Sequence, residues 1–155
     1  MSDESRRAPA ATPELRTAVT PTRVAGVTLH RMVRVEDGRG ILCAADFGVH
    51  VPFTPSRYFV IFDVASSQIR GKHAHRKCHQ FLVCVRGSVA VAVDDGRATD
   101  EILLDAADLG LHVPPMVWAI QYRYSSDALL LVFASDPYDP DDYIRHYEEF
   151  RAIVS

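Results

Sequence analysis

Between Val27 and Ser135 the chain is a succession of short segments rich in apolar residues, divided by turn residues such as Gly, Pro and Asp; apolar and polar residues alternate most clearly in 27–35 and 88–96. Alternation with a period of two is typical of strands that bury one face, and β-branched and aromatic residues favour strands. The segments that predict strands are 27–35, 41–46, 57–64, 70–87, 88–96, 101–105, 109–114, 117–124 and 127–135. Many short strands at this spacing predict a β-sandwich or barrel.

Two of the turns between the predicted strands have Asp and Gly residues that are typical of hairpins. The run Asp37-Gly38-Arg39-Gly40 separates the first two segments and predicts an opening hairpin. The pair Asp95-Gly96 is a two-residue hairpin signal.

The two ends of the chain lack this alternation. Residues 1–26 are rich in Ala, Pro, Thr, Ser and Arg and show no apolar periodicity, so they predict a mobile tail before a single domain of residues 27–155. At the other end, Asp139 and Pro140 provide an N-cap and a first-turn proline. Residues at helical spacing follow, and they predict one C-terminal α-helix that packs through an aromatic stripe: Tyr143, Tyr147, Phe150 and Val154.

Composition limits the partners and the compartment. The net charge of −3 over 155 residues gives no basic excess for binding nucleic acid. No run of eighteen apolar residues predicts a membrane span. The 3 cysteines are an odd number without CxxC spacing, which is typical of thiols in a reducing compartment. The sequence therefore predicts a soluble cytoplasmic protein without disulfides.

The sequence His73-Ala74-His75 is the main candidate for chemistry. In a strand, side chains two positions apart project from the same face, so both imidazoles enter one space at the start of an apolar strand. Three interpretations follow: hydrogen-bonded histidines without a catalytic role, two ligands of a metal, or a pair that moves protons near neutral pH.

The metal interpretation fits the spacing but lacks ligands. Metal-binding cupin barrels carry HxH, then a Glu after three or four residues, then a Gly after six, and a further His in a later strand. Here Gln80 replaces the Glu, Gly87 keeps the frame, and segment 114–119 holds no histidine. Catalytic metal sites usually need three protein ligands, so the sequence predicts no metal.

Several segments together resemble the nucleotide-sugar 3,4-ketoisomerases, small metal-free cupins. The matching segments are DGRG (37–40), RYFVIFDV (57–64), RGKHAHRKCHQFLVCVRGSVAVAVDDG (70–96), VPPMVW (113–118) and SSDALLLVFASDPYDPDDYIRHYEEF (125–150). The resemblance implies an all-β cupin double-stranded β-helix, or jelly-roll barrel, with one C-terminal α-helix and no cofactor. It also implies a homodimer whose N-terminal strands are exchanged or packed across the interface.

The implied reaction converts a dTDP-linked 4-keto-6-deoxyhexose to its 3-keto isomer through an enediol, before an aminotransferase in a deoxyamino-sugar pathway. The resemblance makes His73 the base that takes the C3 proton and His75 a second catalytic residue. The substrate-binding residues that it implies are Arg39, Arg57, Arg70, Gln80, Trp118 and Ala119. Ala119 stands where relatives carry a polar or basic residue, which leaves the C4 configuration of the product open.

Two other functions agree with the same residues. A non-catalytic cupin could bind a nucleotide sugar through Arg39 and Arg70 while its histidines only form hydrogen bonds. A cupin similar to sugar 3,5-epimerases would also take protons from carbons next to a ketone.

Overall fold

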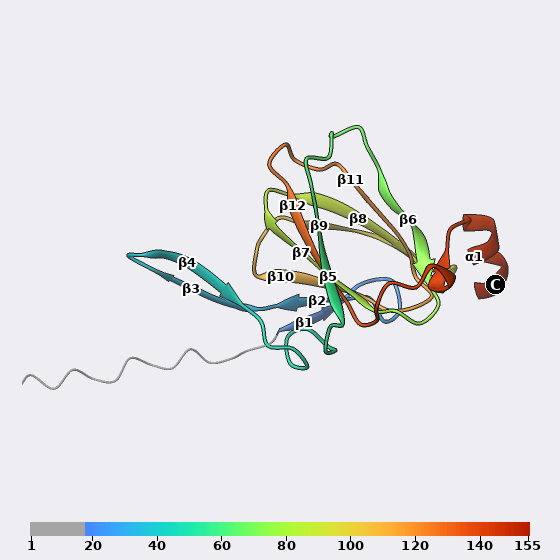
Figure 1. Cartoon of the computed structure of the whole chain (residues 1–155), viewed down its shortest axis with the longest axis horizontal. Coiled ribbons are helices and arrows are strands. Elements are labelled where there is room, and N and C mark those ends of the chain that lie inside the picture. Colours follow the sequence, from blue (N-terminus) through green and yellow to red (C-terminus); the bar gives the residue numbers. More distant parts are fainter. Residues whose placement is uncertain (1–17) are drawn as a thin grey trace, which may run out of the picture.

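The structure is a computed structural model that describes residues 18–155, and almost every segment in it is a strand or a turn (Figure 1). The elements are β1 (Val19–Pro21), β2 (Thr28–Arg31), β3 (Val33–Asp37), β4 (Gly40–Ala44), β5 (Arg57–Phe62), β6 (Arg70–His75), β7 (Gln80–Arg86), β8 (Val89–Asp94), β9 (Thr99–Leu104), β10 (Leu109–Val113), β11 (Trp118–Tyr122), β12 (Leu129–Ala134), the 3₁₀ turn η1 (Pro140–Asp142), β13 (Tyr143–Ile144) and α1 (Tyr147–Val154).

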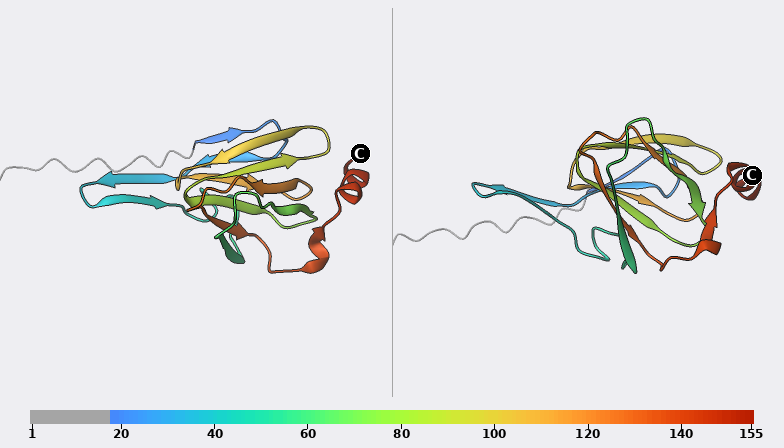
Figure 2. Two further views of the ribbon diagram at one scale, coloured as in Figure 1. Left: turned by 90° about the horizontal axis from the view of Figure 1, so that it is seen from above. Right: turned by 45° about the horizontal axis from the view of Figure 1, so that its top comes forward.

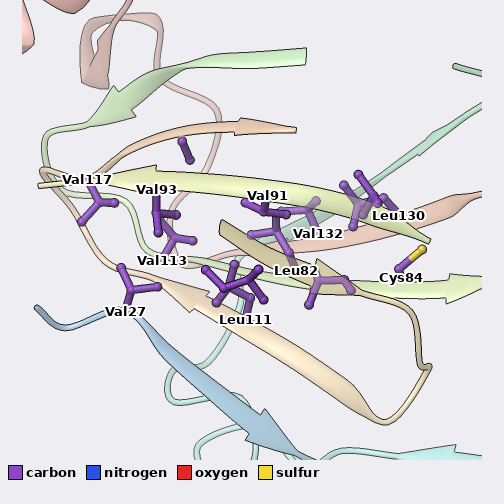
Figure 3. Packing of buried hydrophobic residues seen from close by; sticks show 14 of the residues in the cluster. Val27, Leu82, Cys84, Val91, Val93, Leu111, Val113, Val117, Leu130 and Val132 are labelled. Carbon is purple, nitrogen blue, oxygen red and sulfur yellow. The ribbon is translucent and has the colours of Figure 1, made fainter. Parts of the chain in front are cut away.

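Two antiparallel sheets form the body of the molecule. One has the strand order β1-β2-β10-β7-β12-β5 and the other β13-β6-β11-β8-β9 (Figure 2). Alternate residues of both sheets meet between them, because one face of each strand points inward. Figure 3 shows the centre of this core, which includes Leu82, Val91, Val93, Leu111, Val113, Leu130 and Val132. The predicted all-β jelly roll with one C-terminal α-helix is confirmed.

A second apolar cluster covers the outer face of the larger sheet. Phe81 and Val83 of β7 are buried there together with Val51, under the loop that follows β4. An imidazole cluster lies beside it, formed by His30, His79 and His112. Nδ1 of His79 and Nε2 of His112 are 2.9 Å apart, and burial lowers the pKa of His112 to about 4, helped by the charges of His79 and His30.

Gly110 provides a stability test for this face. A Cβ on Gly110 would lie 2.1 Å from Cζ of Phe81, whose side chain is fully buried. We expect Gly110→Ala to lower the free energy of unfolding by about 2–3 kcal/mol, since the ring must leave its packed position. Denaturant unfolding measures the change. Gly38→Ala is the control because nothing lies within 4 Å of its added Cβ, and equal stability of both variants would contradict the packing.

The predicted opening hairpin is present, but its first strand is divided. Thr28–Arg31 pairs with β1 and β10 in the larger sheet, whereas Val33–Asp37 leaves the body and pairs with β4. The β3–β4 hairpin projects from one end of the molecule, and α1 lies at the other end (Figures 1 and 2). Val35, Ile41 and Leu42 on this hairpin are exposed.

The folded part begins earlier than predicted. Residues 1–17 of the expected tail lie outside the described residues, but Val19–Pro21 forms β1 and pairs with β2. Val24 is fully buried in the main core. The composition gave no sign of this strand, because a proline argues against a strand in the sequence. Pro21 is tolerated here because β1 is an edge strand, where the missing N–H of proline is not needed.

The C-terminal prediction is partly wrong. Asp139 does cap a turn with Pro140 at its first position, but the turn is the short η1 and not the start of α1. Tyr143 belongs to β13, where it pairs with His75, because the Asp142 carboxylate and the β6 backbone hold this segment in an extended form. No helix of residues 18–155 has the length and apolar character to cross a membrane.

The second turn signal marks a longer loop than expected. Asp94 pairs with Thr99, so four residues, 95–98, connect β8 and β9 instead of two. Gly96 adopts φ +89° in this loop, which explains the glycine.

Candidate active site

His73 and His75 lie in β6 and point to the interior face of the smaller sheet. His73 pairs with Ala119 of β11, which is buried in the main core, and His75 pairs with Tyr143 of β13. Paired residues of antiparallel strands share a face. The ring centroids of the two histidines are 4.9 Å apart with an interplanar angle of 89°.

A bulge in β6 brings Arg70 to the same face. The register shifts between Ala119 and Ile120, so that Arg70 pairs with Gln121 although it is three residues from His73. Gly71 has φ +83° and packs on β11: its Cβ would lie 2.9 Å from the carbonyl oxygen of Ala119. Only glycine fits this close approach.

Tyr143 and Asp142 complete the surroundings of the histidines. The ring of Tyr143 lies 4.9 Å from that of His73 and 4.5 Å from that of His75, between centroids. Nδ1 of His75 is 2.9 Å from Oδ2 of Asp142, and both side chains are almost fully buried. A histidine pair therefore sits between an aromatic ring and a buried carboxylate.

Burial keeps both histidines neutral at physiological pH. It lowers the pKa of His73 to about 4, with a further contribution from the charge of His75 and a smaller opposing one from a hydrogen bond to Gly71. Burial also lowers the pKa of His75, but the hydrogen bond and charge of Asp142 oppose it. Neutral imidazoles can accept protons, which suits a base.

Positive charge surrounds the pair. The guanidinium carbon of Arg145 lies 4.2 Å from the Tyr143 ring centroid, and that of Arg57 lies 5.7 Å from the Tyr138 ring centroid. Arg145 contributes to the lowered pKa of both histidines and Arg57 to that of His75. Within residues 18–155, Arg57, Arg70 and Arg145 form no salt bridge with a carboxylate. They are available to an anionic ligand.

The remaining predicted residues are divided between the two faces. Gln80 is buried on the inward side of β7, in line with Leu82 and Cys84 of the main core. Trp118 points the opposite way from Ala119 and packs on the ring of Phe150 in α1, at 5.8 Å between centroids. The structure therefore brings Gln80 and Ala119 toward the histidines, but not Trp118.

Arg39 is the predicted residue that lies furthest from the pair. It sits at the tip of the β3–β4 hairpin, with its side chain 91% exposed and paired with Asp37. The hairpin points away from the end of the molecule at which β6 meets α1 (Figure 1). Arg39 cannot contribute to the site of its own chain in this arrangement.

One group of side chains has the spacing of metal ligands. Donor atoms of His75, Cys78 and Asp142 all lie within 4.8 Å of one another, and all three residues are buried. Both oxygens of Asp142 already accept hydrogen bonds, from His75 and from the backbone N–H groups of Lys77 and Cys78. The oxygens of Asp142 are thus engaged in hydrogen bonds, and the absence of a catalytic metal stays a prediction from Gln80.

Sequence reasoning missed Asp142, Tyr143 and Arg145. Asp142 and Tyr143 were assigned to a helix, and a helical assignment removes them from the sheet that carries the histidines. The available signal for a site was that acidic, aromatic and basic residues lie close together in 139–145.

The fold and the histidine pair define a class, the cupin-like sugar isomerases. The solved sugar 3,4-ketoisomerase of Thermoanaerobacterium thermosaccharolyticum in complex with TDP matches with a TM-score of 0.82 and 31% identity, over 84% of this chain and 96% of that one. The TDP-quinovose 3,4-ketoisomerase of Campylobacter jejuni matches with a TM-score of 0.79 and 35% identity, over 83% of this chain and 99% of that one.

The sequence comparisons identify the family. The family described as FdtA, WxcM-like, C-terminal, matches residues 25–155. The TDP-4-oxo-6-deoxy-α-D-glucose 3,4-oxoisomerase of Aneurinibacillus thermoaerophilus is 43% identical over 122 residues, which are 79% of this chain and 88% of that protein. The chain belongs to the FdtA family and is an isomerase, so the resemblance found in its segments is confirmed.

Proposed function

We propose that the chain converts a TDP-linked 4-keto-6-deoxyhexose to its 3-keto isomer. The observation that carries this proposal is the pair of buried, neutral imidazoles of His73 and His75 in a barrel of the FdtA family. The substrate class follows the relatives, two of which act on TDP-linked sugars by name. The reaction moves protons and needs no external oxidant, because C3 is oxidised as C4 is reduced.

His73 is the base in this proposal. Its neutral imidazole takes the proton from C3, the electrons of the C–H bond form the C3–C4 double bond of an enediolate with the negative charge on O4, and after the proton of O3 has passed to O4 the protonated His73 delivers a proton to C4 as the C3 ketone forms. The low pKa of His73 makes the protonated form a strong acid, so it gives the proton back readily.

The arginines without carboxylate partners supply the charge for the diphosphate. The charges of Arg57 and Arg145 act on the histidines, and Arg70 lies in the same strand on the same face. Guanidinium groups bind phosphate oxygens through paired N–H donors. Gln80 and Ala119 line the inward face near the sugar. Trp118 is left out of this substrate site, because it packs on α1.

We infer that the active form is a homodimer. A two-stranded hairpin is not stable by itself in water, yet β3–β4 projects from the body with Val35, Ile41 and Leu42 exposed. The edge strand β5 also exposes apolar side chains, Tyr58 and Phe62. A second copy can cover both surfaces, and Arg39 at the hairpin tip then reaches a histidine pair only in the partner protomer.

Incubation with TDP-4-keto-6-deoxyglucose in heavy water, followed by ¹³C and ¹H NMR, tests the reaction. We expect the ketone to move from C4 to C3 and one deuteron to appear at C4, because the protonated imidazole of His73 exchanges its N–H with the heavy water before it protonates C4. A 3,5-epimerase would leave the ketone at C4 and label C3 and C5. A non-catalytic binding protein would bind TDP but leave the sugar unlabelled, and either result would overturn the proposal. We propose that an aminotransferase then acts on the 3-keto product, as the first step toward a deoxyamino sugar.

A further inference from the structure

The carboxylate of Asp142 fixes the protonation pattern of His75. Its Oδ2 lies 2.9 Å from Nδ1 of His75, and both residues are only 5% exposed. An ionised carboxylate can only accept hydrogen bonds, so Nδ1 of His75 carries the hydrogen. The other ring nitrogen, Nε2, therefore carries the lone pair, and it is buried without a hydrogen-bond partner among residues 18–155.

The main chain holds this carboxylate in place independently of His75. The N–H of Lys77 donates to Oδ1 at 2.8 Å and the N–H of Cys78 donates to Oδ2 at 3.3 Å. The N–H of Arg76 donates to the carbonyl of Asp142 at 2.9 Å, and the next residue, Tyr143, pairs with His75 in the sheet. The carboxylate is thus oriented toward His75 before any substrate binds, as in a preorganised site.

The two histidines differ in this respect. His73 has no carboxylate beside it, and its hydrogen bond goes to the neutral carbonyl of Gly71. His75 has a buried carboxylate on Nδ1 and an unoccupied Nε2. A proton on Nε2 of His75 is stabilised by the charge of Asp142, while a proton on His73 is not. His75 therefore holds an added proton more strongly than His73 does.

We propose that Asp142 is a positioning residue that makes His75 the carrier of the hydroxyl proton, while His73 carries the carbon-bound proton. This inference rests on the proposed isomerisation. The reaction must move one proton from C3 to C4 and another from the O3 hydroxyl to O4. Nε2 of His75 accepts the O3 proton as that oxygen becomes the new carbonyl, and it returns the proton to O4, which becomes the new hydroxyl. Nδ1 keeps its hydrogen bond to Asp142 throughout.

Asp142→Asn tests the assignment. The Asn oxygen can keep the bond from the N–H of Lys77, which places its NH₂ group against Nδ1 of His75. The ring must then change to the tautomer with hydrogen on Nε2, and the base is lost. We expect kcat to fall by about 10²- to 10⁴-fold with KM changed by less than about threefold, by analogy with carboxylates that set a catalytic tautomer. ¹⁵N NMR of labelled histidine should report Nδ1–H in the wild type and Nε2–H in the variant.

Two further variants separate positioning from folding. Asp141→Asn changes an exposed neighbour whose carboxylate has no contact with His75, and we expect wild-type kinetics. In a His75→Asn background, Asp142→Asn should add no further loss, since its effect passes through His75; a structural role would add its full loss again. A fully active Asp142→Asn enzyme, an Nε2–H tautomer in the wild type, or an additive double variant would overturn the assignment. Absence of turnover by the wild type would instead overturn the proposed function, while the tautomer of His75 seen by ¹⁵N NMR would still test its pairing with Asp142.

Discussion

His73→Asn is expected to lower kcat by about 10²- to 10⁴-fold, the range that a general base contributes. Asparagine is smaller than histidine but polar, and its amide cannot accept a proton from carbon. His73 lies on the inward face of β6 beside Ala119, so the substitution changes no packing of the core clusters. The variant should therefore fold and bind TDP like the wild type. Solvent deuterium incorporation at C4 measures the loss.

The pH dependence gives a second measurement of the same residue. A base acts only when it is neutral, and the pKa of His73 in the folded chain is about 4, below the ordinary value because of burial and of the charge on His75. We expect kcat/KM, which reports the pKa values of the free enzyme, to be level between about pH 6 and 8 and to fall as the pH decreases toward that pKa.

The control for His73 is His146→Asn. His146 is exposed at the start of α1 and its side chain makes no capping hydrogen bond, so turnover should not change. Turnover by His73→Asn within threefold of the wild type would show that another group takes the C3 proton, and His75 would then be the first alternative.

Ile41→Asp combined with Leu42→Asp is expected to convert a dimer into a monomer. Both side chains are 58% exposed on the projecting hairpin, and in a dimer each would bury apolar surface. Placing two carboxylates in such an interface costs several kcal/mol per pair of protomers, because they would lose water without a partner charge. Light scattering during size-exclusion chromatography measures the mass.

Substrate binding should weaken when the dimer is lost. If Arg39 acts in the site of the partner, the monomeric variant loses a cation for the substrate, and we expect KM to rise at least about tenfold. Leu103→Asp is the matched control: Leu103 is 55% exposed, but it lies on β9 in the other sheet, and its variant should remain dimeric and active. A wild-type chain that is monomeric at micromolar concentration would contradict the interface.

The strands were predictable wherever one face is buried and the other is not. β12 alternates between buried and partly exposed residues along its whole length, and β8 does so from Val91 to Asp94, because period two is a local property of a strand. The path of the chain near Met32 was not predictable, since β2 and β3 read as one continuous strand. They are separate strands because β2 pairs with β10, which is distant in sequence, whereas β3 pairs with β4.

The site was predictable as far as it lies within one strand. The spacing of His73 and His75 alone places both on one face of β6. Arg70 lies on the same face only because a bulge shifts the register of the strand. Asp142 was hidden because a carboxylate in the first turn of a helix and a carboxylate beside a buried histidine give the same sequence signal. The structure distinguishes them by pairing Tyr143 with His75, an interaction across more than sixty residues of chain.

The imidazole cluster on the outer face makes the stability of the fold depend on pH in the acid range, where catalysis by His73 is also expected to fall. His112 has a pKa of about 4 in the folded chain and burial also lowers that of His30, whereas an unfolded histidine titrates near 6.5. Their contribution to stability is complete above about pH 6.5 and is lost as the pH falls toward 4, since the unfolded chain then binds the protons more tightly. Lowering the pH therefore weakens the outer face of the larger sheet, which does not contact the sugar, before it protonates His73. A rate lost at low pH belongs to the chemistry only if it returns at once when the sample is neutralised.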